Sequence, residues 1–491
     1  MTPQFFVPLA LYLALTLGLA LWARGRASRS GGARGFLEEY FLGGRSMGGF
    51  VLAMAIIAGY TSAGSFVGGP GVAYALGLGW VLLAMIQVPT VFLTLGVVGK
   101  RFAILSRRFG AVTITDFLRA RYRSEAVVIL CSAALLVFFT AAMLAQFIGG
   151  ARIFQAVTGY AYETGLIIFG LTVVIYTAVG GFRAVVLTDA IQGVVMVVAA
   201  LVILAAVLDA GGGMENCVRK LREIDPALLT PFGPGGSLPA PMLLSFWVLV
   251  GLGVLGLPQT VQKCMAYRDS RAMHAAMLVG TAVTGFLLLC LHLAGTLGRA
   301  VLPDLPSGDL VMPTLTVSLL SPFWAGVFVA GPLAAIMSTV DSMLLMASAA
   351  IVKDLYIRYR LKNDLSRLTP ERISRMSLAC TLGLGLLVFA AALRPPELLV
   401  WINLFAFGGL EAVFLWPIVL GLYWKRADTR GALCSMIVGF VVFLGLSAGG
   451  ISPWGVHPIV PTALASLSAF WLGTLSGAAR DAAKKRARER H

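Results

Sequence analysis

The chain has 491 residues, of which 58% are hydrophobic and only 12% are charged, and its mean hydropathy is +0.89. This composition excludes an ordinary soluble domain and is typical of a protein that crosses a membrane many times. The formal net charge of +16 does not indicate a nucleic-acid partner, because the sequence contains no nucleic-acid-binding motif and no soluble segment large enough to hold one.

Thirteen apolar segments fit membrane crossings, and we therefore predict an all-α polytopic membrane protein with about 13 transmembrane helices. Between spans nine and ten, Thr369 and Pro370 predict the start of a short helix with Thr369 as its N-cap. In chain order, the predicted spans are 5–23, 47–73, 77–99, 125–150, 162–181, 185–209, 241–262, 273–297, 322–350, 376–393, 397–421, 431–449 and 457–476.

The lysines and arginines predict the orientation of these spans. If the N-terminus lies outside, 32 of the 38 basic residues fall in inner loops or the C-terminal tail, and only six fall outside. Because cytoplasmic loops carry an excess of Lys and Arg, we place the N-terminus outside and the C-terminus inside. Lys263 is counted here as one of the basic residues of the inner loop after span seven. The basic cytoplasmic tail, residues 477–491, is expected to meet anionic lipid headgroups.

An internal repeat is predicted within a single transmembrane domain, residues 1–476. Spans two to six and spans seven to eleven each contain five helices, and because five is an odd number, the second set has the opposite orientation in the membrane. The predicted parts are a first inverted repeat at 46–209, a second at 241–424 and extra helices at 431–476.

Two predicted spans contain interruptions that would break a membrane helix. Four glycines and a proline lie within residues 64–71 of the segment Ala58–Gly71, and span seven contains the interruption Gly251–Pro258. A broken helix frees backbone carbonyls, which hydrocarbon cannot satisfy, so such a break survives only where it lines a cavity or binds something. Span nine carries a Ser-Thr pair within Ala335–Thr339. Carbonyl and hydroxyl oxygens without fixed charge suit a small hard cation such as Na⁺.

Three motifs resemble those of the sodium/solute symporter family. Tyr40–Gly49 (YFLGGRSMGG) resembles the start of that family's second helix, Thr188–Gln192 (TDAIQ) looks like its TDxxQ element, and Gly421–Gly439 (GLYWKRADTRGALCSMIVG) looks like its longest signature. The resemblance runs in order from about residue 36 to 440. It implies a LeuT-like fold, with an inverted five-helix repeat and extra helices, and sodium-coupled transport.

A narrower resemblance points to the substrate. Gly77–Gln87, Phe405–Trp424 and His457–Pro461 look closest to the branch of the family that carries pantothenate, a flexible monocarboxylate with hydroxyls and an amide. The implied function is sodium-coupled uptake of pantothenate across the cytoplasmic membrane, and the implied location is the inner membrane of a bacterium. No obligate protein partner and no enzymatic motif is visible.

The family's sodium site transfers onto five positions. The carbonyls of Ala58, Thr61 and Ala335 and the hydroxyls of Ser338 and Thr339 are the implied ligands. The residues agree with this assignment, because adjacent hydroxyls on one helix, with a carbonyl three residues before the first, can converge on one point. The alternative for such a pair is a hydrogen bond from each hydroxyl back to the carbonyl four residues earlier.

Several further polar residues have two interpretations each. The resemblance places Asp189 on the inner sodium release path, whereas helix capping by Thr188 or Asp189 is the alternative. Asp341 shares a helix face with Ser338, and it could tune sodium release or pair with a cation, or it could instead be a snorkelling or water-exposed acid. His292 is expected to be a packed neutral histidine rather than a proton relay. Candidate substrate-binding residues, each of which could instead join helices, are Tyr60, Ser62, Ser65, Gln87, Gln146 and Gln259.

The sequence is compatible with other functions. The substrate could be another monocarboxylate or an amino acid such as proline, although the family's proline carriers have an acid where Tyr60 stands here. A membrane sensor is a candidate from another class, since this fold is sometimes fused to signalling kinases, but residues 477–491 leave no room for a kinase.

Overall fold

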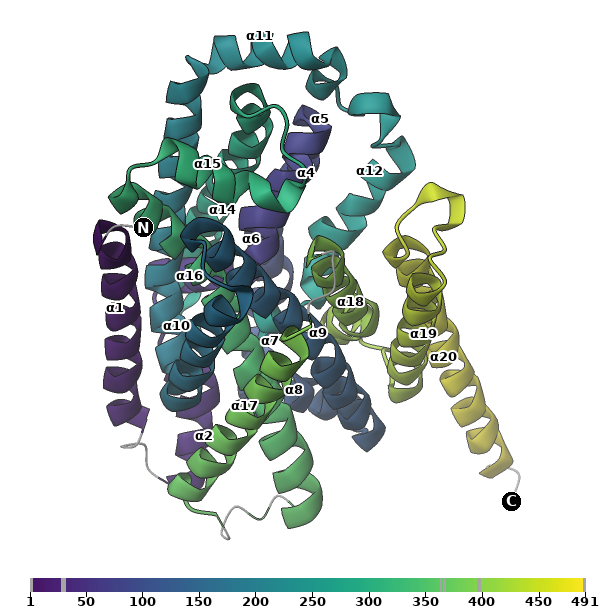
Figure 1. Ribbon diagram of the computed structural model, residues 1–491. Coiled ribbons are helices and arrows are strands. Elements are labelled where there is room, and N and C mark those ends of the chain that lie inside the picture. The colour runs from purple at the N-terminus through teal and green to yellow at the C-terminus, as the bar shows by residue number, and fades with distance from the viewer. Residues whose placement is uncertain (1–2, 28–31, 363, 365–367, 395–398, 489–491) are drawn as a thin grey trace.

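The computed structural model describes residues 3–27, 32–362, 364, 368–394 and 399–488, and this part of the chain is almost entirely helical (Figure 1). The helices that correspond to predicted spans are α1 (Pro3–Ala27), α3 (Gly49–Tyr60) with α4 (Gly69–Leu76), α5 (Leu78–Met85) to α7 (Lys100–Phe109), α9 (Glu125–Thr158), α10 (Tyr162–Gly211), α12 (Ala240–Phe246) with α13 (Pro258–Lys263), α14 (Ser270–Val301), α16 (Pro322–Ala349), α17 (Pro370–Ala392), α18 (Leu399–Tyr423), α19 (Thr429–Ala448) and α20 (Ile459–Arg488). The shorter helices between them are α2 (Gly32–Leu42), α6 (Thr90–Leu93), α8 (Ile114–Tyr122), α11 (Met214–Ile224) and α15 (Val311–Leu319).

The prediction of an all-helical, multi-pass membrane protein is confirmed. In the described part of the chain, ten helical stretches are long and apolar enough to cross a membrane, and α3 with α4 forms an eleventh that is bent by 72°. Two shorter apolar stretches, Tyr162–Ala178 and Ala240–Gly256, lie where spans five and seven are predicted. The total of 13 spans and the sides on which the termini lie stay predictions.

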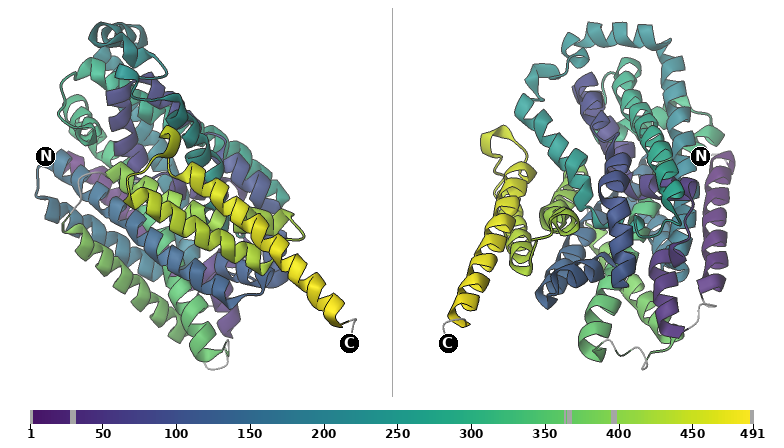
Figure 2. Two further views of the ribbon diagram at one scale, coloured as in Figure 1. Left: turned by 90° about the vertical axis from the view of Figure 1, so that its right-hand side faces the viewer. Right: turned by 180° about the vertical axis from the view of Figure 1, so that it is seen from behind.

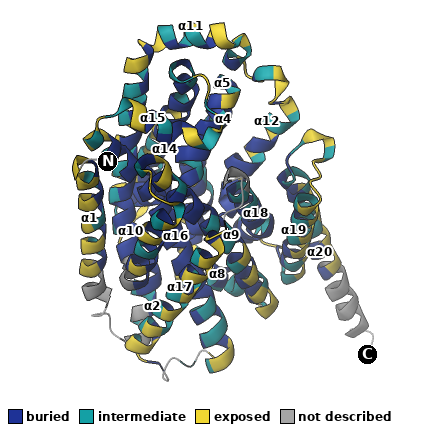
Figure 3. Ribbon diagram, in the orientation of Figure 1, coloured by how far each residue is buried: buried dark blue, intermediate teal, exposed yellow. Residues whose placement is uncertain are grey.

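Helix α16 forms the centre of the bundle. In an 18-residue apolar stretch of this helix, 94% of the residues are buried, whereas the fraction is 33% in the corresponding stretches of α1 and α19. Figure 3 shows the same contrast, with α16 largely dark blue and exposed residues along α1, α19 and α20. Large apolar side chains such as Leu11 and Trp471 remain exposed on the outer helices, as expected for surfaces that face lipid. Figure 2 shows α19 and α20 as a pair along one side of the bundle.

Two local predictions can be compared with the structure directly. Thr369 is the N-cap of α17, and its side chain accepts a hydrogen bond from the backbone N–H of Arg372. The predicted cap is therefore confirmed, but the helix is not short, because it continues for 23 residues through span ten. Helix α20 likewise continues beyond span thirteen, into the segment predicted as a basic tail.

The segment before α3 pairs with the segment after α13. The backbone N–H of Met47 donates to the carbonyl of Ala266 at 3.1 Å, and the N–H of Arg268 donates to the carbonyl of Met47 at 3.0 Å. The start of the first broken span thus lies beside the end of the second broken span. The contact is compatible with opposite orientations of the two broken spans, which stay a prediction.

Candidate sodium and substrate sites

The chain leaves the helical conformation between α3 and α4. Thr61 is extended, with φ −73° and ψ 132°, and the helix resumes through the π-helical turn Gly64–Gly68. The backbone N–H of Ala63 donates to Oε1 of Gln146 at 2.8 Å instead of to a helical carbonyl. A side chain of α9 therefore supplies the hydrogen bond that the break removes, which is how a membrane helix tolerates such a break.

A buried polar network holds this break in place. Nε2 of Gln146 donates to Oδ1 of Asn403 at 3.1 Å, and Nδ2 of Asn403 lies 3.4 Å from Oγ of Ser62. The network joins α9 and α18 to the first residues after α3. Gln146 was predicted to bind substrate, but it does not line the cavity described below, and its hydrogen bonds assign it to the support of the break.

We expect Gln146→Leu to destabilise the protein and to weaken its response to sodium together. The substitution leaves the buried N–H of Ala63 without a partner, which costs about 1–3 kcal/mol. Thermal unfolding of the purified protein and the sodium dependence of uptake measure the two effects. Gln155→Leu, at an exposed position on the same helix, is the matched control; equal behaviour of the two variants would contradict the assigned role.

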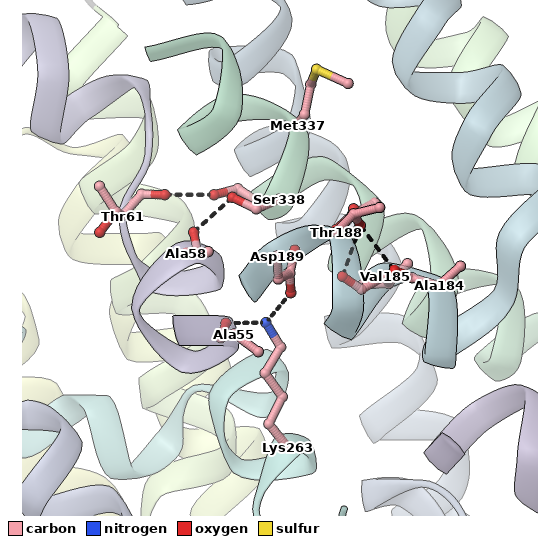
Figure 4. A network of polar contacts seen from close by, with 12 residues as sticks. Ala55, Ala58, Thr61, Ala184, Val185, Thr188, Asp189, Lys263, Met337 and Ser338 are labelled. Carbon is pink, nitrogen blue, oxygen red and sulfur yellow. Dashed lines mark hydrogen bonds and ion pairs between the residues drawn. The ribbon is translucent and has the colours of Figure 1, made fainter. Parts of the chain in front are cut away.

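All five predicted sodium ligands meet at one point. Oγ of Ser338 lies 2.8 Å from the carbonyl of Ala58, and Oγ1 of Thr339 lies 2.9 Å from the carbonyl of Thr61. Both hydroxyls are also within 3.0 Å of the carbonyl of Ala335. The five residues are almost completely buried, and Figure 4 shows the carbonyl of Ala58 facing Ser338 between α3 and α16.

This arrangement suits a small cation. Each hydroxyl has one hydrogen and can donate to only one of its two carbonyl neighbours at a time, so its lone pairs stay available. Three carbonyls and two hydroxyls supply only neutral oxygen ligands, the chemistry that hard monovalent cations take in membrane sites. The back-bonding alternative is also present, because Oγ1 of Thr339 is 2.8 Å from the carbonyl four residues earlier. Back-bonding within α16 does not explain the contacts of both hydroxyls to the carbonyls of Ala58 and Thr61.

Asp189 lies on α10, beside the turn of α3 that precedes Ala58, and it is completely buried. Its Oδ2 accepts a hydrogen bond from Nζ of Lys263 at 2.8 Å, and the same ammonium donates to the carbonyl of Ala55 at 2.6 Å (Figure 4). Thr188 bonds back to carbonyls of its own helix, so it does not act as an N-cap. Lys263 was not predicted as a site residue, because a lysine at the end of an apolar segment resembles an ordinary inner-loop residue.

Asp341 is not exposed to water in this structure. It is completely buried, and its Oδ2 is 2.6 Å from the hydroxyl of Tyr176, which is also 3.1 Å from the carbonyl of Met337. The alternative of a water-exposed acid is therefore wrong in this structure.

A cavity of about 70 Å³ opens beside the break, and four of the six candidate substrate residues line it. These are Tyr60, Ser62, Ser65 and Gln87, and the hydroxyl of Tyr60 donates to Oε1 of Gln87 at 2.8 Å. Gln259 does not line the cavity, although it is buried. The volume is far below the roughly 300–1,000 Å³ of ordinary ligand sites, so this cavity must widen to admit a substrate. The lining residues that the sequence analysis did not propose include Trp80, Phe246, His292, Asn403 and Phe407.

His292 lines the cavity and makes a hydrogen bond within its own helix. Its Nδ1 lies 2.8 Å from the carbonyl of Leu288, and because a carbonyl only accepts, Nδ1 carries the hydrogen. A Cβ placed on Gly69 would lie 2.4 Å from Nε2, so the imidazole packs closely against the start of α4. In the neutral ring Nε2 is an acceptor at the cavity. The prediction of a packed neutral histidine agrees with this geometry but missed its position at the cavity.

Two broken helices, a cluster of neutral oxygens and an adjoining cavity define the class of ion-coupled secondary transporters. The chain matches the sodium:solute symporter family over residues 40–439, and it belongs to that family. It is 53% identical over 477 residues to the sodium/pantothenate symporter of Escherichia coli K12, covering 96% of this chain and 97% of that protein. It is 50% identical over 477 residues to the sodium/pantothenate symporter of Haemophilus influenzae, covering 96% of each chain.

The solved structures confirm the predicted LeuT-like fold. A Na⁺-coupled sialic acid symporter in a substrate-bound outward-open state superposes with a TM-score of 0.78, covering 97% of this chain and 98% of that chain. The two sequences are only 17% identical, so the likeness concerns the fold alone.

Proposed function

We propose that this protein takes up pantothenate across the cytoplasmic membrane, coupled to sodium entry, by alternating access. The coupling is supported by the contacts of the Ala58 and Thr61 carbonyls with the hydroxyls of Ser338 and Thr339. The next residue after Thr61, Ser62, lines the cavity. The substrate follows from the high identity to two sodium/pantothenate symporters over nearly the whole chain.

The sodium site and the cavity share the same break. Sodium would bind first, draw α3 and α16 together and fix Ser62 at the cavity wall. Because the two binding events are linked, sodium raises the affinity for substrate and the substrate raises the affinity for sodium by the same factor. We further propose that residues 46–209 and 241–424 are inverted repeats that rock against each other, with Asp189 on the inner release path.

The cavity favours an anion with neutral polar groups over a zwitterion. Its lining offers Tyr60, Gln87, Asn403 and His292 for hydroxyl, amide and carboxylate groups, together with aromatic surface. Among the described residues that line it there is no aspartate or glutamate to pair with an ammonium group. Proline is therefore the weaker candidate substrate, and nothing in the described part of the chain favours a sensor or an enzyme over a transporter.

Uptake into proteoliposomes tests the function. We expect labelled pantothenate to accumulate when an inward sodium gradient is imposed and not when choline replaces sodium. Unlabelled pantothenate should compete at micromolar-scale levels, whereas proline at a thousandfold excess should not. Accumulation that does not depend on sodium would contradict the coupling, and strong competition by proline would contradict the substrate.

A further inference from the structure

Lys263 is a buried lysine at the end of the second broken span. Its side chain is only 3% exposed, and its ammonium bridges Asp189 on α10 and the carbonyl of Ala55 on α3. Lysine is almost never buried unless it is paired, because an uncompensated charge is costly away from water. The inner-loop role that the sequence suggested therefore does not describe this residue.

The ammonium lies next to the sodium site. Ala55 precedes Ala58 by three residues, which is about 4.5 Å along a helix axis. The displacement is toward the start of α3, the end that the basic residues predict to be cytoplasmic. Figure 4 shows the order along α3, with Ala58 facing Ser338 and Ala55 facing Lys263. A sodium ion that leaves its site toward the cytoplasm meets this ammonium first.

The oxygens around the ammonium are those of a cation site. Oδ1 of Asp189 and Oγ of Ser342 are buried and have no hydrogen-bond partner among the described residues. A Cβ placed on Gly59 would lie 2.3 Å from Nζ of Lys263 and 3.6 Å from Oγ of Ser342, so both groups crowd the same glycine. A carboxylate, a carbonyl and a hydroxyl thus gather at one place, which the ammonium now fills.

The second buried acid does not require its own cation. Tyr176 has one hydroxyl hydrogen but two oxygen neighbours, Asp341 and the carbonyl of Met337. Both contacts are hydrogen bonds when Asp341 is protonated and donates to Tyr176, which then donates to Met337. In that arrangement Asp341 is neutral, and Lys263 balances Asp189 alone.

We propose that Lys263 is a built-in cation that occupies the place of a second sodium ion at Asp189 and closes the inner release path. This inference rests on the proposed sodium coupling. Sodium can leave inward only when the ammonium withdraws from Asp189 and Ala55, and the returning ammonium prevents sodium from binding there again. Each transport cycle then carries one sodium ion fewer than it would with an unpaired Asp189.

The sodium count of Lys263→Met tests this proposal. We expect its sodium-to-pantothenate flux ratio, measured from reversal potentials in proteoliposomes, to exceed the wild-type ratio by one. The double variant Lys263→Met/Asp189→Asn should return to the wild-type ratio, because it removes the carboxylate that would bind the extra ion. Lys263→Arg, which keeps the positive charge, should also keep the wild-type ratio.

If Lys263→Met folds but does not transport, sodium binding to the purified variant tests the proposal instead. Purified Lys263→Met should bind one more radioactive sodium ion at saturation than the wild type and should gain more thermal stability from sodium. An unchanged flux ratio with unchanged sodium binding overturns the proposal, as does a variant that fails to fold even in saturating sodium. Wild-type uptake that is independent of sodium would instead overturn the proposed function.

Discussion

The double substitution Ser338→Ala/Thr339→Ala is expected to abolish sodium-driven uptake at physiological sodium concentrations. Each hydroxyl contacts a carbonyl of the break in α3 and one of α16. A hydrogen bond or ligand contact to a charged group contributes about 1.5–3 kcal/mol, so each single substitution should raise the half-saturating sodium concentration roughly tenfold or more. The two effects need not add, because the hydroxyls share the carbonyl of Ala335.

Sodium titration of initial uptake rates measures this effect. Ser348→Ala is the matched control, because Ser348 is a buried serine of the same α16 stretch whose hydroxyl bonds to the carbonyl of Ser377, away from the break. The control should keep the wild-type half-saturating concentration at equal expression. A double variant with wild-type sodium dependence would show that these oxygens do not bind the coupling ion.

Tyr60→Asp should reduce pantothenate uptake by at least about 100-fold. The hydroxyl of Tyr60 is bonded to Gln87, and its ring stacks on Phe407 with centroids 6.5 Å apart. A carboxylate at this place would be a buried charge without a partner and would repel an anionic substrate, which together cost several kcal/mol. Tyr60→Phe keeps the ring and loses only the hydrogen bond to Gln87, so its loss should be about 2–10-fold.

Competition experiments on the same variants separate binding from turnover. In Tyr60→Asp, the concentration of unlabelled pantothenate needed to displace the label should rise with the loss of uptake, while sodium binding should be retained. Undiminished uptake by this variant would exclude Tyr60 from the substrate site and leave the sodium site unaffected. Loss of both activities would indicate that the substitution disturbs the break itself.

The sequence determined the class of protein and the location of its breaks. Hydropathy is a property of each segment alone, and hydrocarbon imposes the same requirement on every span, so the helices could be predicted one at a time. The break after α3 follows from glycine and proline content, and the N-cap at Thr369 follows from local chemistry. The five oxygens of the sodium site also belong to two short motifs, which the family resemblance joined before the structure placed them together.

Only the tertiary structure decided what surrounds those motifs. Asn403 reaches Ser62 across 341 residues of sequence, and Lys263 reaches Asp189 across 74. Gln146 and Gln259 were indistinguishable from Gln87 in the sequence, yet only Gln87 lines the cavity. A polar side chain in a membrane helix must find a partner, and the sequence shows that need but not the partner. Whether such a residue supports the break, binds a ligand or carries a compensating charge depends on which helices the fold brings beside it.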